Sequence, residues 1–178
     1  GGFAVAANKL YIIGSFNASA TPPVVTAQVW QFDPNAAVGS RWLARTAYPV
    51  ARAYVPAATI GGFIYTAGGA NLDAGGLLID TADSFKYDPV GGTWTAIANI
   101  PRATGETRAV VVNNQMWVLG GGRVAPNPSN QVNIYDPGSN TWSVGLPFTT
   151  ARRNFPADGD GSRVFLAGGY DTSGTTLL

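Results

Sequence analysis

Short apolar runs, each closed by glycine, recur along the chain at a nearly constant spacing. Steps of 54, 52 and 48 residues separate the closing glycines, which are Gly14, Gly68, Gly120 and Gly168. An aromatic residue stands three positions before every one of them: Tyr11, Tyr65, Trp117 and Phe165. Short runs rich in β-branched and aromatic residues and bounded by glycine predict β-strands. The regular spacing predicts a repeat protein made of one supersecondary unit.

Two further markers follow in the same order within each of the first three repeats. The first is an Asp-Pro pair, at Asp33, Asp88 and Asp136, and the second is a tryptophan, at Trp42, Trp94 and Trp142. Asp can accept a hydrogen bond from its own backbone two residues on, and Pro fixes φ, so we interpret these pairs as structural turns. We expect the tryptophans to pack between neighbouring repeats.

Each repeat divides into four short strands. In the second repeat we predict strands at Ala53–Ile60, Phe63–Ala67, Thr81–Tyr87 and Thr93–Ile97, with a long loop at Ala70–Asp80. Two-residue turns rich in Gly and Asn join the first and second strands, and we predict them at Gly61-Gly62, Asn8-Lys9, Asn113-Asn114 and Asp160-Gly161. No segment has helical periodicity. The pattern therefore predicts an all-β chain of about 14 strands.

The Gly-Gly doublet, the Tyr-Asp-Pro turn and the following Thr-Trp resemble the kelch repeat. The resemblance implies a kelch-type β-propeller segment of about three and a half four-stranded antiparallel blades. We expect blades at 1–49, 50–101 and 102–150 and a partial blade at 151–178, within one propeller domain that is part of a longer chain. The first repeat departs from the pattern, with Gly14-Ser15 in place of the doublet and a longer turn before Trp42. The Gly-, Thr- and Asn-rich sequence resembles that of prokaryotic, extracellular kelch proteins, and this resemblance implies secretion or a place at the cell surface.

The amino-acid composition excludes several classes of function. The chain has 46% hydrophobic and 12% charged residues and a net charge of +1, so a nucleic-acid binder that relies on phosphate contacts is not expected. It has no Cys and no His, which excludes a thiolate nucleophile and a Ser-His-Asp triad within this segment. The run Asp158–Gly161 resembles the start of a calcium loop but lacks the later ligands. We expect no metal, no cofactor and no membrane span here.

Arginine recurs where the fourth strand of one repeat leads into the first strand of the next. Arg52, Arg102 and Arg152 hold this position, with the register of the third repeat shifted by two, and Arg108 and Arg153 lie nearby. A ring of guanidinium groups would bind carboxylates or acidic peptides. Alternatively, each arginine bonds backbone carbonyls of an adjoining blade. Further candidates come from the long loops that differ between repeats: Asn71 and Asp73 in Gly69–Asp80, and Arg123 and Asn127 in Gly121–Asn130.

Two classes of function stay open. The first is a non-catalytic binding or scaffolding module that recognises a protein or a glycan through its loops, because unlike loops on a repeated frame carry specificity. The second is part of a carbohydrate-active kelch enzyme, of the galactose-oxidase or sialic-acid-mutarotase type, whose catalytic residues lie in other blades. We expect further blades from the same chain or from other subunits to cover the open faces.

Overall fold

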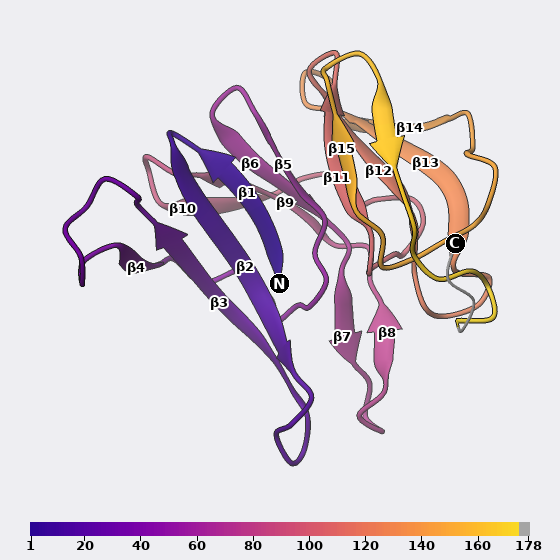
Figure 1. Ribbon diagram of the computed structural model, residues 1–178, viewed down its shortest axis with the longest axis horizontal. Coiled ribbons are helices and arrows are strands. Elements are labelled where there is room, and N and C mark those ends of the chain that lie inside the picture. The colour runs from indigo at the N-terminus through magenta and orange to yellow at the C-terminus, as the bar shows by residue number, and fades with distance from the viewer. Residues whose placement is uncertain (175–178) are drawn as a thin grey trace.

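The computed structural model describes residues 1–174, and those residues form strands and no helix. Three four-stranded antiparallel sheets follow one another, and a two-stranded sheet comes last (Figure 1). The first sheet contains, in spatial order, β1 (Gly2–Ala6), β2 (Lys9–Asn17), β3 (Val24–Phe32) and β4 (Trp42–Arg45). The all-β prediction is confirmed.

The second and third sheets repeat this order. The second contains β5 (Ala57–Ile60), β6 (Phe63–Ala67), β9 (Ser84–Asp88) and β10 (Thr93–Ala96). The third contains β11 (Arg108–Val112), β12 (Gln115–Gly121), β13 (Ser129–Asp136) and β14 (Thr141–Gly145). The last pair is β15 (Ala157–Gly159) and β16 (Val164–Leu166). The described residues therefore form three blades and the first half of a fourth, as predicted.

Several local predictions were wrong. The loop expected at Ala70–Asp80 forms a hairpin of β7 (Ala70–Leu72) and β8 (Leu78–Asp80), because the Asp73 carboxylate closes its turn on Gly75 and Leu77. The strand expected from Ala53 begins only at Ala57, because Pro56 has no N–H to donate and Tyr54 has a φ of +53°. The first tight turn is Ala7-Asn8, since Ala6 pairs with Lys9. The last is Gly161-Ser162 and not Asp160-Gly161, since the Asp160 N–H donates to the Arg163 carbonyl at 3.2 Å. The strand expected from Thr81 begins at Ser84, because the Thr81 N–H donates to the Gly69 carbonyl and does not join the sheet.

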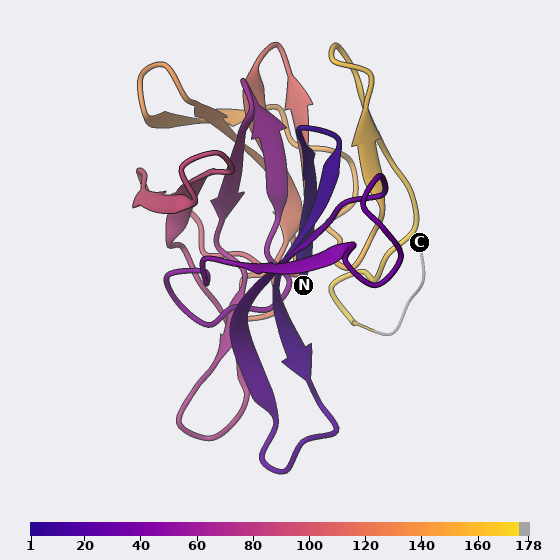
Figure 2. The same ribbon diagram turned by 90° about the vertical axis from the view of Figure 1, so that its left-hand side faces the viewer.

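The first strands of the blades lie next to one another. β1 contacts β5, β5 contacts β11, and β11 contacts β15, so these four strands line the centre of the molecule (Figures 1 and 2). Each blade thus presents its first strand to the centre and its fourth strand to the outside. The starts of all first strands consequently meet at one place, which positions the site described below.

The core consists of three apolar clusters, one between each pair of neighbouring blades. Successive residues of a strand point to opposite faces of the sheet. Ile64 therefore packs toward the first blade, and the adjacent Tyr65 packs toward the third. The third cluster joins the third blade to the partial fourth around Leu119 and Phe155. Aromatic residues thus fill the space between blades, as the repeat pattern predicts.

The recurrent tryptophans join each blade to the one before it. Trp94 Nε1 donates to the Thr46 carbonyl oxygen at 3.1 Å, and Trp142 Nε1 donates to that of Ala98 at 2.7 Å. The predicted packing between blades is confirmed for both residues. Trp42 has no preceding blade among the described residues, and 51% of its surface is exposed while its ring packs on Phe32.

Candidate functional site

The two ends of the blades differ in the length of their connections. One end has the tight turns between first and second strands, where Asn8, Gly61, Gly62, Asn113 and Asn114 all have positive φ. The same end has the turns between third and fourth strands, where the recurrent aspartates each accept an N–H from two residues on: Asp33, Asp88 and Asp136. The structural interpretation of these aspartates is confirmed.

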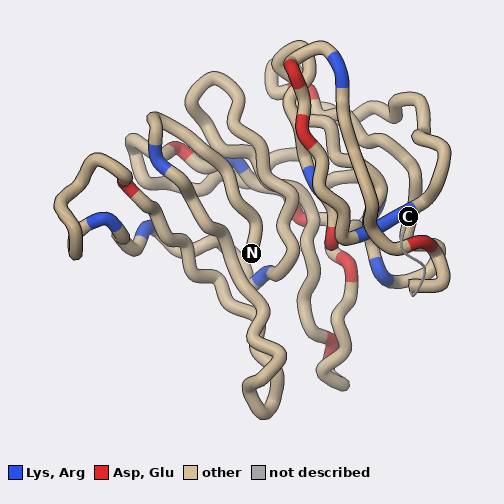
Figure 3. Tube along the Cα trace, viewed as in Figure 1, with Lys and Arg blue, Asp and Glu red and all other residues tan. Residues whose placement is uncertain are grey.

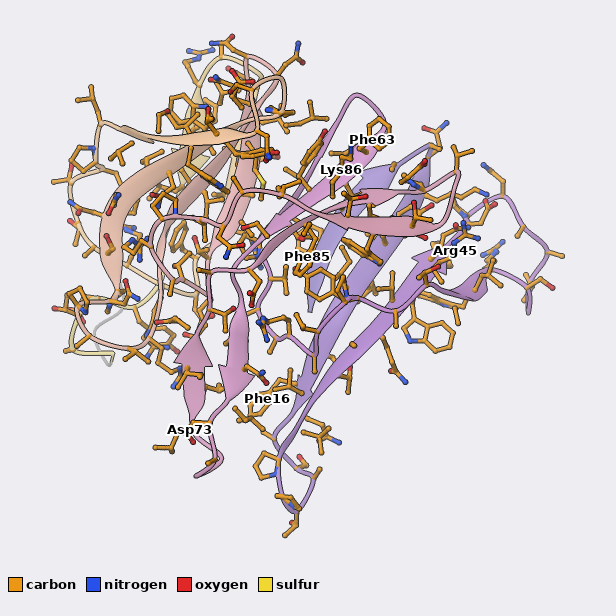
Figure 4. The ribbon with its side chains drawn as sticks, turned by 180° about the vertical axis from the view of Figure 1, so that it is seen from behind. Phe16, Arg45, Phe63, Asp73, Phe85 and Lys86 are labelled. Carbon is orange, nitrogen blue, oxygen red and sulfur yellow. The ribbon has the colours of Figure 1, made fainter. Side chains whose placement is uncertain are left out.

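The opposite end carries the long connections, and we call it the loop face. It is defined by residues 17–24, which are the last residue of β2, the connection and the first residue of β3, by the β7–β8 hairpin, and by residues 122–128 between β12 and β13. The first two project side by side from the lower side of the molecule (Figures 1 and 2). Asp73 lies at the end of the β7–β8 hairpin, and Phe16 lies on the neighbouring hairpin of β2 and β3 (Figure 4). The starts of the first strands open onto this same face.

The charged residues lie mainly at strand ends and connections, and the two signs are interspersed (Figure 3). Among residues 1–174, no group of three His, Cys, Asp or Glu side chains could hold a metal ion. Asp160, from the run that resembles a calcium loop, instead accepts the N–H groups of Ser162 and Arg163. No helix in the described part of the chain is long and apolar enough to cross a membrane.

Arg52 and Arg152 use their guanidinium groups within the fold. Arg52 is 5% exposed, donates to the Ala51 carbonyl at 2.9 Å and forms an ion pair with Asp83. Arg152 donates to the Gly168 carbonyl at 2.8 Å and to that of Thr150 at 3.2 Å. Both arginines therefore clamp the backbone around the connection between blades.

Arg102 also bonds within the fold, although its position in the repeat is shifted by two residues relative to Arg52 and Arg152. It donates to the Gly120 carbonyl at 2.7 Å and to the Asn127 side-chain oxygen. Burial lowers the pKa of Arg102, and the charge of Asp80 acts in the opposite direction. The residue that aligns with Arg52 and Arg152 is Thr104, whose hydroxyl donates to the same Gly120 oxygen at 2.9 Å. The three arginines thus donate hydrogen bonds to backbone carbonyls of glycines and of the connections between blades. Their role in ligand binding stays a prediction.

Asp80 fixes the connection 122–128 to the second blade. Its Oδ2 accepts from the N–H groups of Arg123 and Val124 at 2.7 and 2.8 Å and from Asn127 Nδ2 at 2.9 Å. Among the predicted binding residues, the structure thus brings Arg102, Arg123 and Asn127 together.

Asn71 and Asp73 lie apart from that group, on the β7–β8 hairpin. The Asn71 side-chain oxygen accepts the Leu72 N–H at 2.8 Å, and that of Asp73 accepts from Gly75 and Leu77. Both side chains therefore shape the hairpin.

The most heavily bonded acid of the loop face is Glu106, which sequence reasoning missed. Its side chain is 1% exposed and forms ion pairs with Arg123 and Arg153. Asn154 Nδ2 donates to the same carboxylate at 3.1 Å, and Arg123 Nε donates to it at 2.8 Å. A buried carboxylate is stable only when paired in this way. The sequence did contain one signal for this residue, because the third repeat has an acid at the position where the second and fourth repeats have Tyr54 and Asn154.

A cavity of about 340 Å³ opens beside Glu106 at the centre of the loop face. Its side-chain walls come from three blades and include Tyr54, Glu106, Arg108, Asn154 and Phe155. A smaller cavity of about 240 Å³ lies on the other side of Arg108, between Phe3 and Asp158. The walls combine aromatic rings with polar groups, as is usual for ligand pockets.

Comparison with known proteins identifies the repeat. Residues 104–145 match the family model described as the Kelch motif. The chain is 26% identical over 165 residues to Kelch-like protein 25 of Xenopus tropicalis, which covers 90% of this chain and 27% of that protein. The chain belongs to the kelch-repeat family. Alpha-scruin of Limulus polyphemus is 28% identical to this kelch chain over 170 residues, which cover 93% of the chain and 18% of alpha-scruin.

A solved structure shows the same kelch fold. The structure of YjhT superposes with a TM-score of 0.74 over 95% of this chain and 57% of that one, at 18% identity. The β-propeller architecture is thereby confirmed. Since the chain spans about a quarter of Kelch-like protein 25, the partners of a whole protein are matters for proposal.

Proposed function

We propose that this kelch chain is a non-catalytic binding module that holds a protein partner on its loop face. One observation carries the proposal. The residues that recur in every blade are used in internal contacts, whereas the connections 17–24, 70–80 and 122–128 differ in length and sequence and expose their tips. Loops that differ from blade to blade and are held on a rigid frame supply specific recognition. The similarity to Kelch-like proteins and scruin supports a binding role.

Exposed apolar side chains on the loop face favour a protein as the partner. Val24 at the start of β3, Leu77 in the β7–β8 turn and Val124 in the connection 122–128 are 42%, 69% and 46% exposed. Apolar groups surrounded by polar residues are common at protein interfaces. A glycan partner and an extracellular location, both expected from the sequence, stay predictions.

Serine substitutions on the two faces test the proposal. Candidate partners are first captured with the full chain from its source and identified by mass spectrometry, and each is then purified. Isothermal titration measures its binding to the full chain, to a loop-face variant (Val24→Ser, Leu77→Ser, Val124→Ser) and to a control variant. The control carries Val38→Ser and Val90→Ser, which lie in turns at the opposite end and are 86% and 95% exposed.

We expect the loop-face variant to weaken binding at least about tenfold, because apolar contacts at the centre of an interface dominate its affinity. The control variant should bind as the full chain does, and thermal unfolding should be equal for all three proteins. A purified partner that binds both variants equally well, or that only the control variant loses, would contradict a loop-face interface.

A further inference from the structure

The tight turn of the third blade differs from the turns at the same place in the other blades. This turn joins the first strand to the second, and in the third blade it is Asn113-Asn114 and is followed by Gln115. The corresponding residues of the other blades are Ala7-Asn8-Lys9, Gly61-Gly62-Phe63 and Gly161-Ser162-Arg163. Among these four turns, only that of the third blade thus carries three consecutive carboxamide side chains.

The backbone of the turn does not require these carboxamides. Asn113 and Asn114 have φ angles of +50° and +59°, and Gly61 and Gly62 supply +57° and +84° in the second blade. Glycine adopts a positive φ more readily than asparagine does. Both asparagines are exposed, and within residues 1–174 neither carboxamide makes a hydrogen bond. Their N–H donors and oxygen acceptors are therefore free for a ligand.

A cavity of about 410 Å³ lies beside this turn, between the second and third blades. The second blade contributes Ile60 and Gly61 to its walls, and the third contributes residues 113–115 and residues 136–138. A Cβ added to Gly61 would meet nothing within 4 Å, so the glycine turn leaves the space open. The bordering turns lie at the end opposite the loop face, which is the upper end in Figure 1. The volume is within the range of small-molecule sites, and Ile60 and Pro137 add apolar surface.

The walls carry one negative charge and are otherwise neutral. Asp136 Oδ2 accepts from Gln115 Nε2 at 3.5 Å, and none of the residues that line the cavity is Lys or Arg. In the first blade, Lys9 at the position of Gln115 pairs with Asp33 at 3.1 Å. Among residues 1–174, no cation lies within 4 Å of the Asp136 carboxylate. The cavity therefore disfavours an anion and offers a neutral ligand both donors and acceptors.

We propose that this cavity binds a neutral pyranose sugar. A hydroxyl group both donates and accepts a hydrogen bond, and a carboxamide does the same through its NH2 group and its oxygen. Neighbouring hydroxyls of a sugar ring can therefore bond Asn113, Asn114 and Gln115, while the Asp136 carboxylate accepts from a further hydroxyl. The apolar part of the wall suits the C–H groups of the ring. The site lies at the end opposite the loop face, so it does not rest on the proposed function.

Titration with sugars and with a matched ring that lacks the ring hydroxyls tests this site. Methyl β-galactopyranoside, methyl β-glucopyranoside and methyl α-mannopyranoside are added separately to the ¹⁵N-labelled full chain. Shifts of the backbone amide resonances of residues 113–115 give the dissociation constants. Tetrahydropyranylmethanol keeps the ring and the hydroxymethyl group and is the matched probe. The uronate of the galactoside, which has a carboxylate in place of the hydroxymethyl group, tests the preference for a neutral ligand.

The second blade supplies the design of the main variant. Asn113→Gly with Asn114→Gly installs the Gly-Gly turn of that blade, which removes both carboxamides and keeps a backbone that has positive φ. Gln115→Met removes the third carboxamide at similar size and tests the site should the double variant not fold. Asn8→Gly is the matched control, because Asn8 has a φ of +59° in the equivalent turn of the first blade and does not line the cavity.

We expect at least one of the methyl glycosides to bind with a dissociation constant in the millimolar range. Tetrahydropyranylmethanol should produce no saturable shift, because a site that bonds hydroxyls rejects an analogue without them. The uronate should bind more weakly than the galactoside, since its charge repels that of Asp136. The double glycine variant should weaken sugar binding at least about tenfold and Gln115→Met about threefold, through lost hydrogen bonds. Asn8→Gly should bind as the full chain does.

The proposal would be overturned if none of the methyl glycosides bound saturably, or if the full chain, the double glycine variant and Gln115→Met bound them equally. Tighter binding of the uronate than of the galactoside would also overturn it, because the cavity would then be an anion site. The free sugar, compared with its methyl glycoside, identifies the source of the pyranose. Tighter binding of the glycoside assigns the ring to a glycan, and tighter binding of the free sugar assigns it to a monosaccharide. Either order supports a pyranose site at this turn.

Discussion

At the scale of single residues, Gly120 is a position that no other residue can occupy without strain. Its φ is +49°, and a Cβ there would meet the Ser129 carbonyl oxygen and lie 2.6 Å from Phe148 Cζ. We predict that Gly120→Ala lowers the free energy of unfolding by about 2 kcal/mol or more, since backbone strain and steric overlap add. Urea denaturation gives the value. Gly39→Ala is the control, because Gly39 has positive φ but nothing within 4 Å of the added Cβ. An equal loss at both positions would show that overlap contributes nothing.

A second residue-scale prediction concerns Asp160 in the last tight turn. The Ser162 N–H, the Ser162 hydroxyl and the Arg163 N–H hold the charged form and lower the pKa of Asp160 to about 2. Because the pKa is lower in the folded chain than in the unfolded chain, the stabilising effect is complete above pH 4 and is lost as pH falls toward 2. NMR titration of the Asp160 carboxyl carbon should give a midpoint near 2. A midpoint near 4 would show that these hydrogen bonds do not persist in solution.

At the scale of strands and blades, tryptophan joins each blade to its predecessor. Trp94 lies with its ring centre 4.6 Å from that of Tyr87 and 4.8 Å from that of Tyr48, besides its hydrogen bond to the Thr46 carbonyl. We predict that Trp94→Phe lowers the free energy of unfolding by about 1–2 kcal/mol through lost packing and the lost bond. Trp42→Phe should change it by less than about 0.5 kcal/mol, because Trp42 is half exposed. Chemical denaturation of both variants measures these losses of unfolding free energy. Equal losses would show that Trp94 does not join the two blades.

The elements also show how far the sequence alone leads. The blade count and the turns at Asp88 and Asp136 follow from local chemistry that recurs, so the repeat makes them readable. The β7–β8 hairpin occurs in one blade only, and its pairing depends on a turn that the Asp73 side chain closes. Glu106 escaped notice for a related reason. Its partners Arg153 and Asn154 lie nearly fifty residues away in another blade, at a separation that no local pattern reports.

At the scale of the whole molecule, Glu106 links two blades and a loop through one buried carboxylate. Replacing it with Gln removes the partner of Arg123 and of Arg153, whose side chain is only 14% exposed. We predict that Glu106→Gln lowers the free energy of unfolding by about 3 kcal/mol, the effect of leaving buried charge uncompensated. Hydrogen exchange should accelerate in β15 and β16 more than in β1 and β2. Arg163→Gln, which breaks an exposed ion pair with Asp160, should leave exchange unchanged. Uniform acceleration across all blades would refute a local link.

The confinement of strand pairing to single blades has a consequence for how the chain folds. Every ladder between named strands joins strands of one blade. The longest loop that such a ladder closes lies between Ala67 and Ser84. Closing a loop of that length costs little entropy, and chains with such local pairing fold fast for β proteins. Each blade can thus complete its hydrogen bonds while later blades are still being synthesised. Contact between blades has to wait for the next blade, so a growing propeller exposes one apolar face at its leading edge throughout translation.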